Sequence, residues 1–174
     1  MERIRELTRG NKTNGLTWEE YQRIKTIITK LRTESNAKLV FLVDKNGQQI
    51  AAQGDLENLD ATSLASLTAG NVAATDGLAK LIGEKEFSIL FHEGERDNIH
   101  ISIVAQRVIL VVIFDNRSSL GLVRLRVKKA SSELTDVFER VVKKINHERE
   151  SGRLDVESPF AEITDDDIDN LFTN

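Results

Sequence analysis

Residues 39–47 read LVFLVDKNG, a short apolar run that ends in a turn signal. Branched and aromatic residues favour a strand, and Asn46-Gly47 supplies the positive φ that a tight hairpin turn needs. The return strand is expected over about Gln48 to Gln53, ending at Gly54. The segment therefore predicts a β-hairpin in the first third of the chain.

A helix is predicted on each side of this hairpin. Before it, Thr17-Trp18-Glu19-Glu20 fits a capping box, in which the Thr17 hydroxyl and the Glu20 carboxylate satisfy free backbone N–H groups. This helix runs to about Asn36. Its apolar face is expected to contain Trp18, Tyr21, Ile24, Ile28 and Leu31. After the hairpin, Asp60 can cap a second helix that extends to about Ile82.

The second helix has two unequal faces. Its inward stripe is expected to be Leu64, Leu67, Ala74, Leu78 and Leu81. The opposite side carries small residues and one lysine, namely Ser66, Ala69, Gly70, Ala73, Gly77 and Lys80. Glycine inside a helix costs roughly 1 kcal/mol relative to alanine, so Gly70 and Gly77 indicate close packing there. The pattern leaves open whether the neighbour belongs to the same subunit or to another molecule.

Three further strands are expected, at Phe87 to His92, Asn98 to Ala105 and Val108 to Phe114. The second of these alternates isoleucine with polar residues, which predicts one face open to water. The polar members are Asn98, His100 and Ser102. The third is apolar throughout, which is typical of a strand buried on both faces, so we expect it at the centre of the sheet.

A long helix completes the folded part and runs to about His147. Either Ser118 or Ser119 can cap it. Its apolar stripe is Leu120, Val123, Val127, Ala130, Leu134, Val137, Val141 and Ile145. The order helix, two strands, helix, three strands, helix predicts an α/β (α+β) fold, in which helices pack against a five-stranded antiparallel sheet.

The 174 residues suit one domain with extensions. We expect a flexible N-terminal extension over residues 1–16, a folded domain over 17–147, a linker over 148–158 and an acidic tail over 159–174. Because the whole chain has a formal net charge of −4 and Ser158 to Asn174 carries −5, the remainder sums to +1. Such an acidic end is typical of an interaction tail.

Several function classes are excluded or disfavoured. Without cysteine, disulfides, thiolate metal sites and cysteine catalysis are impossible. The three histidines show neither metal spacing nor a Ser-His-Asp order, and no glycine run has the Gly-Lys-Ser/Thr ending of a phosphate loop. We expect no catalytic activity and no bound cofactor or metal. The polar start and the lack of a bilayer-length apolar run predict a cytoplasmic protein.

Long segments of the chain are similar to a known family. They read FLVDKNG over 41–47, TSLASLTAGNVAA over 62–74, VVIFDNR over 111–117, SPFAEI over 158–163 and DDDIDNLF over 165–172. The chain resembles the MglB-like bacterial members of the roadblock/dynein-light-chain family, over about Thr17 to Lys144 and again in the tail.

This resemblance implies a homodimer whose outer strands join into one continuous sheet. It also implies that the paired second helices form a platform for the Ras-like GTPase MglA, with two copies of the chain holding one GTPase. In that family the platform promotes GTP hydrolysis by moving the GTPase's own catalytic residues into place. GTP and Mg²⁺ would then be bound by the partner. Gliding motility, cell polarity and enrichment at a cell pole follow from the same resemblance.

Two sets of partner-binding residues follow. The first is the small side of the second helix, with Ser66, Ala69, Gly70, Ala73, Gly77 and Lys80. The second is the apolar set of the tail, Pro159, Phe160, Ile163, Ile168, Leu171 and Phe172, which can form a short helix in a groove. The resemblance further implies that the tail makes a second contact that promotes nucleotide exchange.

Alternatives remain at this level. A passive roadblock scaffold and a ligand-sensing module of the PAS or GAF kind are both compatible with the predicted elements. Arg107 or Arg117 could insert as an arginine finger. The basic residues Arg117, Arg124, Arg126, Lys128 and Lys129 could bind phosphate, although the acidic balance and the lack of interleaved aromatic residues disfavour nucleic acid.

Overall fold

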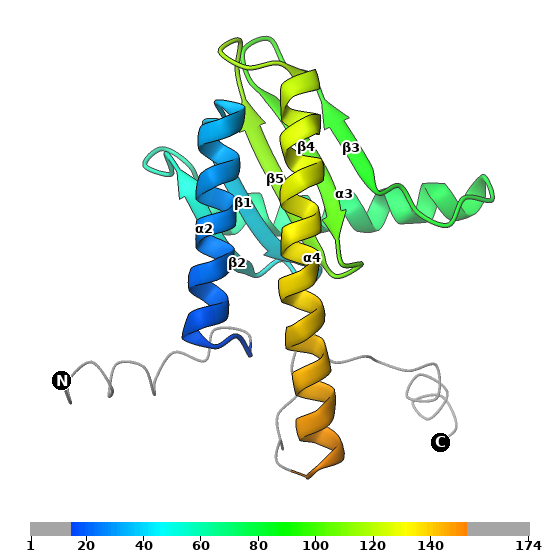
Figure 1. The fold of residues 1–174 in the computed structure, drawn as a ribbon. Coiled ribbons are helices and arrows are strands. Elements are labelled where there is room, and N and C mark those ends of the chain that lie inside the picture. Colours follow the sequence, from blue (N-terminus) through cyan, green and yellow to red (C-terminus); the bar gives the residue numbers. More distant parts are fainter. Residues whose placement is uncertain (1–14, 153–174) are drawn as a thin grey trace, which may run out of the picture.

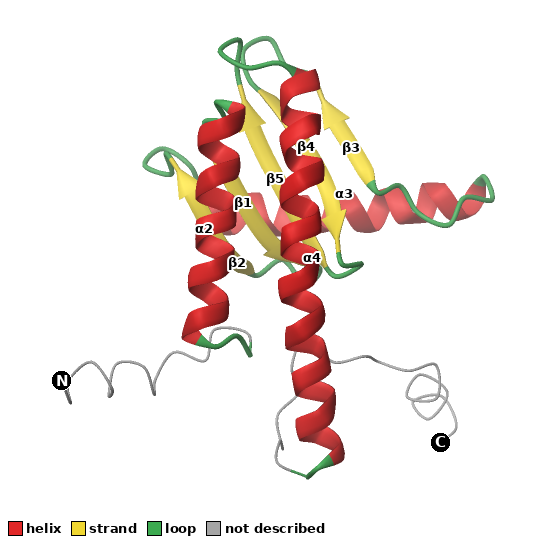
Figure 2. Ribbon diagram, viewed as in Figure 1, coloured by secondary structure: helices red, strands yellow, loops and turns green. Residues whose placement is uncertain are grey.

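The computed structural model describes residues 15–152, and within that range the chain forms three helices and five strands (Figures 1 and 2). Their bounds are α2 Trp18–Ser35, β1 Leu39–Asp44, β2 Gln49–Gly54, α3 Ala61–Leu81, β3 Ile89–His92, β4 Asn98–Val104, β5 Val108–Phe114 and α4 Leu120–Glu150. The predicted elements are thus all present in the predicted order.

The strands form one antiparallel sheet with the order β2-β1-β5-β4-β3. The apolar strand β5 lies at the centre, as its composition predicts. Helices α2 and α4 cover one face of this sheet, and α3 crosses the other face (Figure 1). The predicted fold class is therefore confirmed.

Local side-chain chemistry fixes the start of each helix. The Thr17 hydroxyl accepts a hydrogen bond from the Glu20 N–H at 3.2 Å, and the Glu20 carboxylate accepts one from the Thr17 N–H at 2.8 Å. Asp60 caps α3 by accepting from the Ser63 N–H at 3.1 Å. Of the two serines before α4, Ser119 is the cap. These contacts replace the hydrogen bonds that the first turn of a helix lacks.

The β1–β2 turn depends on Gly47, whose φ is 83°. One carboxylate oxygen of Asp44 accepts hydrogen bonds from the backbone N–H groups of Asn46 and Gln48, both at 2.9 Å. A Cβ atom on Gly47 would lie 3.2 Å from the Cα atom of Ser66. Glycine is therefore required both by the left-handed backbone and by the close approach of α3.

The sheet separates two apolar cores. Seven of the eight residues predicted for the α4 stripe are buried, and the eighth, Leu120, packs at the margin of the larger core. That core also takes Ile24, Ile28 and Leu31 from α2. Leu16, which the sequence placed in the N-terminal extension, is only 7% exposed and joins it. The smaller core lies between the sheet and α3.

Two predictions about which side chains are buried, one on β4 and one on α2, are wrong. The polar side of β4 is not open to water: His100 is 1% exposed and Ser102 5%, because α4 and its neighbours cover that face. Trp18, assigned to the apolar face of α2, is 63% exposed. It occupies the first position of the helix, and the helix buries Ile27 in addition to the predicted residues further along.

Candidate partner-binding site

The side of α3 that faces away from the sheet carries few large polar side chains. Gly70 and Gly77 have no atom within 4 Å of the position that a Cβ atom would take. Ser66, Ala73 and Lys80 are exposed as well. The two glycines are therefore not packed against anything within the described part of the subunit, and another backbone can approach the helix at these positions.

Ala69 behaves differently from the rest of its predicted set. Its side chain is 9% exposed and belongs to the core between α3 and the sheet, together with Ala65 and Val72. Ala69 therefore holds the helix against the sheet and presents little surface to a partner. The other members of the set stay exposed.

The predicted inward stripe of α3 is wrong for four of its five members. Leu67 is 73% exposed, Leu78 57% and Leu81 83%, and Ala74 is exposed too. Only Leu64 packs against the smaller core. The helix instead turns small residues toward the sheet, which lets its backbone lie close to the strands, and the buried ones are Ala65, Thr68, Ala69, Val72 and Ala79.

Several large apolar residues of α3 and its C-terminal end are exposed. In the described range eight such residues are strongly exposed, and five of them lie on α3, at its C-cap or at the start of β3. These five are Leu67, Leu78, Leu81, Ile82 and Ile89. Single exposed apolar residues are ordinary, but Leu78, Leu81 and Ile82 are neighbours at the C-terminal end of α3, and such a group marks an interaction surface. Sequence reasoning missed these leucines as partner-binding residues, although a helix that is apolar on nearly all sides is itself a signal of two contacts.

The position of this group in the fold is also informative. Strand β3 is an edge of the sheet, and the C-terminal part of α3 extends past it (Figures 1 and 2). The overhanging part carries Leu78, Leu81 and Ile82 below the place where a further strand would lie. The side-chain amide of Asn71 on α3 forms a 2.9 Å hydrogen bond with Nε2 of His92 on β3, which ties the helix to this edge.

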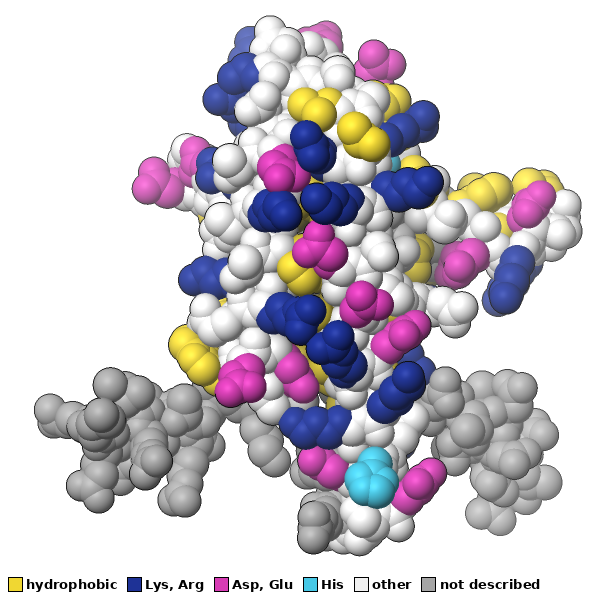
Figure 3. Space-filling model, in the orientation of Figure 1, with side chains coloured by type: hydrophobic (Ala, Val, Ile, Leu, Met, Phe, Trp, Pro, Cys, Tyr) yellow, Lys and Arg dark blue, Asp and Glu magenta, His cyan; other side chains and the backbone are white. Residues whose placement is uncertain are grey.

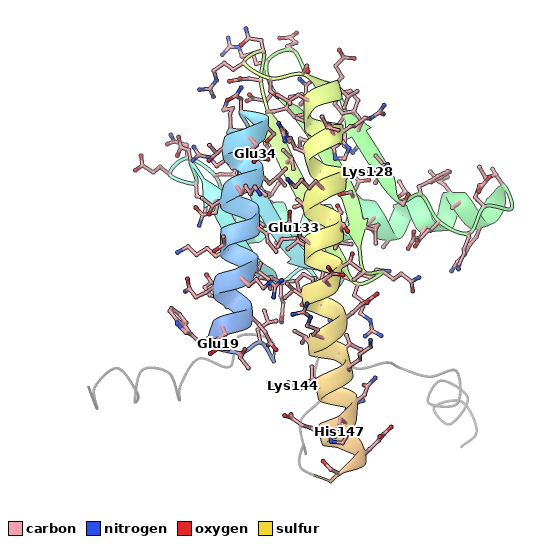
Figure 4. The ribbon with its side chains drawn as sticks, in the orientation of Figure 1. Glu19, Glu34, Lys128, Glu133, Lys144 and His147 are labelled. Carbon is pink, nitrogen blue, oxygen red and sulfur yellow. The ribbon has the colours of Figure 1, made fainter. Side chains whose placement is uncertain are left out.

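The basic residues singled out in the sequence do not form one patch. Arg117 is held by Asp115, at 3.0 and 3.1 Å, and this pairing lowers the pKa of Asp115 and raises that of Arg117. Arg126 pairs with Glu34 of α2 at 3.2 Å. Lys128 lies on the other side of α4, nearer β3, as Figure 4 shows. Figure 3 shows basic and acidic side chains interspersed over the face made by α2 and α4.

The histidines lie apart from one another. His92 contacts α3, His100 is buried beneath α4, and His147 lies in the last turn of α4. Among residues 15–152 no three His, Asp or Glu side chains are grouped as metal ligands would be. In the same range no helix is both long and apolar enough to cross a bilayer. The tail set Pro159, Phe160, Ile163, Ile168, Leu171 and Phe172 lies outside the described residues.

Comparisons with known proteins agree with this architecture. The Roadblock/LC7 domain model matches residues 23–114. The solved structure of Myxococcus xanthus MglB is 61% identical with a TM-score of 0.70, and the match covers 72% of this chain and 95% of that chain. A gliding protein MglB from Thermus thermophilus is 32% identical with a TM-score of 0.68, covering 75% and 98%. A structure of MglB with a tetrameric arrangement is 31% identical with a TM-score of 0.69, covering 75% and 98%. No curated protein matched the chain.

Proposed function

The chain belongs to the Roadblock/LC7 family, and from this membership and its likeness to MglB we propose that it works as a homodimer that stimulates GTP hydrolysis by an MglA-like Ras-type GTPase. Its likeness to MglB indicates a regulator of an MglA-type GTPase. The homodimer, the acceleration of hydrolysis and the residues that carry them are the proposal. The exposed face of α3 is the observation on which it rests most.

The dimer follows from the edge of the sheet and the overhang of α3. An unpaired edge strand offers free backbone N–H and C=O groups to a further strand. If a second copy adds its own β3 in antiparallel register, its sheet extends over the overhanging part of α3. Leu78, Leu81 and Ile82 would then be covered. A contact in which the same surface meets itself is the expected form of a two-fold dimer.

The GTPase platform uses the other flank of the same helix. Two α3 helices brought together by the dimer would present their small residues, Ser66, Gly70, Ala73 and Gly77, as one shallow surface. Residues without long side chains allow a partner's backbone to approach within van der Waals distance. Because one platform is built from two helices, one GTPase would engage two copies of this chain.

The proposed catalytic effect is positional. The GTPase holds GTP and Mg²⁺, and hydrolysis needs a water in line with the γ-phosphate and charge stabilisation on the transferred group. A rigid surface that holds the GTPase's own catalytic loops in the productive arrangement lowers the barrier without adding a reacting group. The tail set around Phe160 and Leu171 would make a separate contact that promotes nucleotide exchange.

Steady-state GTP turnover by a purified MglA-like GTPase, titrated with this chain, tests the proposal. We expect turnover to rise and to saturate at two copies of the chain per GTPase. A partner that binds at that ratio without any rise in turnover would identify a passive scaffold instead, and the acceleration would be wrong.

The same assay distinguishes positioning of the GTPase's own residues from a mechanism in which an arginine of this chain enters the GTPase active site. We expect Arg107→Ala and Arg117→Ala to leave the stimulated rate largely intact, because neither guanidinium takes part in the proposed mechanism. An arginine finger contributes roughly 10³-fold or more, so a loss of that size in either variant would replace the positional mechanism.

A further inference from the structure

The face of β3 that lies opposite α3 carries a second apolar surface, which is only partly covered. Because side chains alternate along a strand, Ile89 and Phe91 both point to the face that α4 covers. Phe91 stacks on Phe114 of the larger core with ring centroids 6.2 Å apart. Ile89, one residue pair closer to the start of β3, is 52% exposed. We call Ile89 and Phe91 the β3 strip.

Two cations border this strip. Arg124 lies close enough to His100 of β4 to help lower the pKa of that imidazole, after the larger effect of burial, which places Arg124 on the β4 side of α4. Lys128 follows one helical turn later and lies on the same side (Figure 4). Both side chains are exposed, and neither forms an ion pair within the described residues. The strip therefore has an apolar floor and a basic wall.

The proposed dimer turns this strip into a trough. Pairing β3 with the partner's β3 sets the two strips side by side, with one α4 helix on each flank. Since α4 lies over β4 and β5, the two helices would be three to five strand spacings apart, about 14–24 Å. A helix packed between two others needs about 16–20 Å between their axes. The trough is therefore the width of one helix, and this inference rests on the proposed dimer.

The C-terminal segment of the chain has the matching chemistry. Residues 158–174 carry five acidic residues and no Lys or Arg. Apolar residues recur among the acids, with Ile168, Leu171 and Phe172 at the three- and four-residue steps of one helix face. An acidic segment with an apolar face complements an apolar floor between basic walls.

The length of the segment is sufficient as well. From Lys128 to Gly152 the helix rises about 36 Å. Eight extended residues from Gly152 to Phe160 span at most about 26–29 Å, and the fourteen residues that follow add about 21 Å if helical. The segment can thus run back along α4 as far as Arg124. The axes of β3 and α4 are roughly aligned, with the two chains running in opposite senses, so a path back along α4 follows the trough (Figure 1).

We infer that, in the absence of the GTPase, one acidic C-terminal segment of the dimer docks in the trough between the two α4 helices, held by the β3 strips and by Arg124 and Lys128 of both subunits. The trough lies on the sheet face opposite the α3 platform. Docking there withholds the segment from its proposed exchange-promoting contact without covering the platform. A single trough on the two-fold axis accepts one of the two segments.

A spin label on the full-length chain tests this inference. The chain has no cysteine, so Asn170→Cys gives a unique site for a nitroxide. We expect the spectrum of the dimer to contain an immobilised component. The charge reversal Arg124→Glu with Lys128→Glu should reduce that component at least threefold, as should 0.5 M salt. The matched control is Lys25→Glu with Lys30→Glu, an exposed pair on the outer face of α2, which should leave the spectrum unchanged.

Light scattering on the same samples separates the two proposals. A dimer that shows no immobilised component, or loses it equally in both charge-reversed variants, contradicts docking in the trough and leaves the dimer intact. Loss only in the α2 variant would place the segment elsewhere and also overturns the inference. A monomeric mass contradicts the proposed dimer, and the trough with it.

Discussion

His100 is a buried imidazole whose two ring nitrogens lack hydrogen-bond partners among the described residues. It pairs with Phe91 and Val112 on the neighbouring strands and lies under α4. Burial is the main cause that lowers its pKa from the ordinary value, and the positive charge of Arg124 adds to the effect. The imidazole is therefore kept neutral in the folded protein at neutral pH.

The free energy of unfolding should consequently depend on acidity through this residue. The unfolded chain takes up the proton near pH 6.5, whereas the folded chain does so only at lower pH. The unfolded state then binds more protons, so stability falls as pH drops below about 6.5 and is unaffected by this group well above it. We expect His100→Leu to flatten that decline, as measured by urea unfolding at pH 7.5 and 5.5. An equal decline in the variant would show that His100 is not its source.

Individual residues also show what local sequence could predict. The caps at Thr17 and Asp60 and the turn at Gly47 were predictable, because each depends on contacts within a few residues. The burial of His100 and Ser102 was not, because it depends on α4, which follows β4 in the chain and covers it from outside the strand. Alternation along a strand indicates two faces but not which of them water reaches.

At the scale of elements, α3 is the exception to an otherwise predictable set. In α4 one continuous stripe is apolar and most other positions are polar or charged, so the inward side is clear from the sequence. In α3 leucines, alanines and glycines lie on nearly every side. The sequence pattern therefore does not show which side packs against the sheet and which side contacts another molecule. The larger residues were assigned inward, whereas the fold places small residues against the sheet and leaves Leu67, Leu78 and Leu81 exposed.

The overhanging end of α3 should carry the dimer contact. Leu78 and Ile82 lie one turn apart, and burying a leucine or isoleucine side chain contributes about 1.5–3 kcal/mol. We expect Leu78→Asp with Ile82→Asp to weaken dimerisation at least 100-fold, measured by sedimentation equilibrium. Leu125→Asp is the control, because Leu125 is similarly exposed, at 62%, but points outward from α4. A dimer that survives the paired change but dissociates with Leu125→Asp would move the interface to α4.

At the scale of the whole molecule, the sheet organises two separate surfaces around β3, one of its two edge strands. The central place of β5 was predictable from its uninterrupted apolar run, and antiparallel order from the short links. The overhang of α3 past β3 was not, because it depends on the angle at which the helix crosses the sheet. That overhang leaves apolar side chains of α3 uncovered beside β3 in the described subunit. The proposed dimer would cover them, and it would form the α3 platform on one face of the sheet and the trough on the other.

The platform itself is tested most directly by titrating an MglA-like GTPase onto Ala73→Arg and Gly77→Arg while recording the mass of the free protein. Both positions are open in the subunit, so the variants should fold and stay dimeric, and affinity for the GTPase should fall at least 100-fold because the arginine occupies the partner's place. Gly121→Arg, at an equally open glycine on α4, should bind normally. Undiminished binding by the two α3 variants would contradict the assignment of this face to the GTPase.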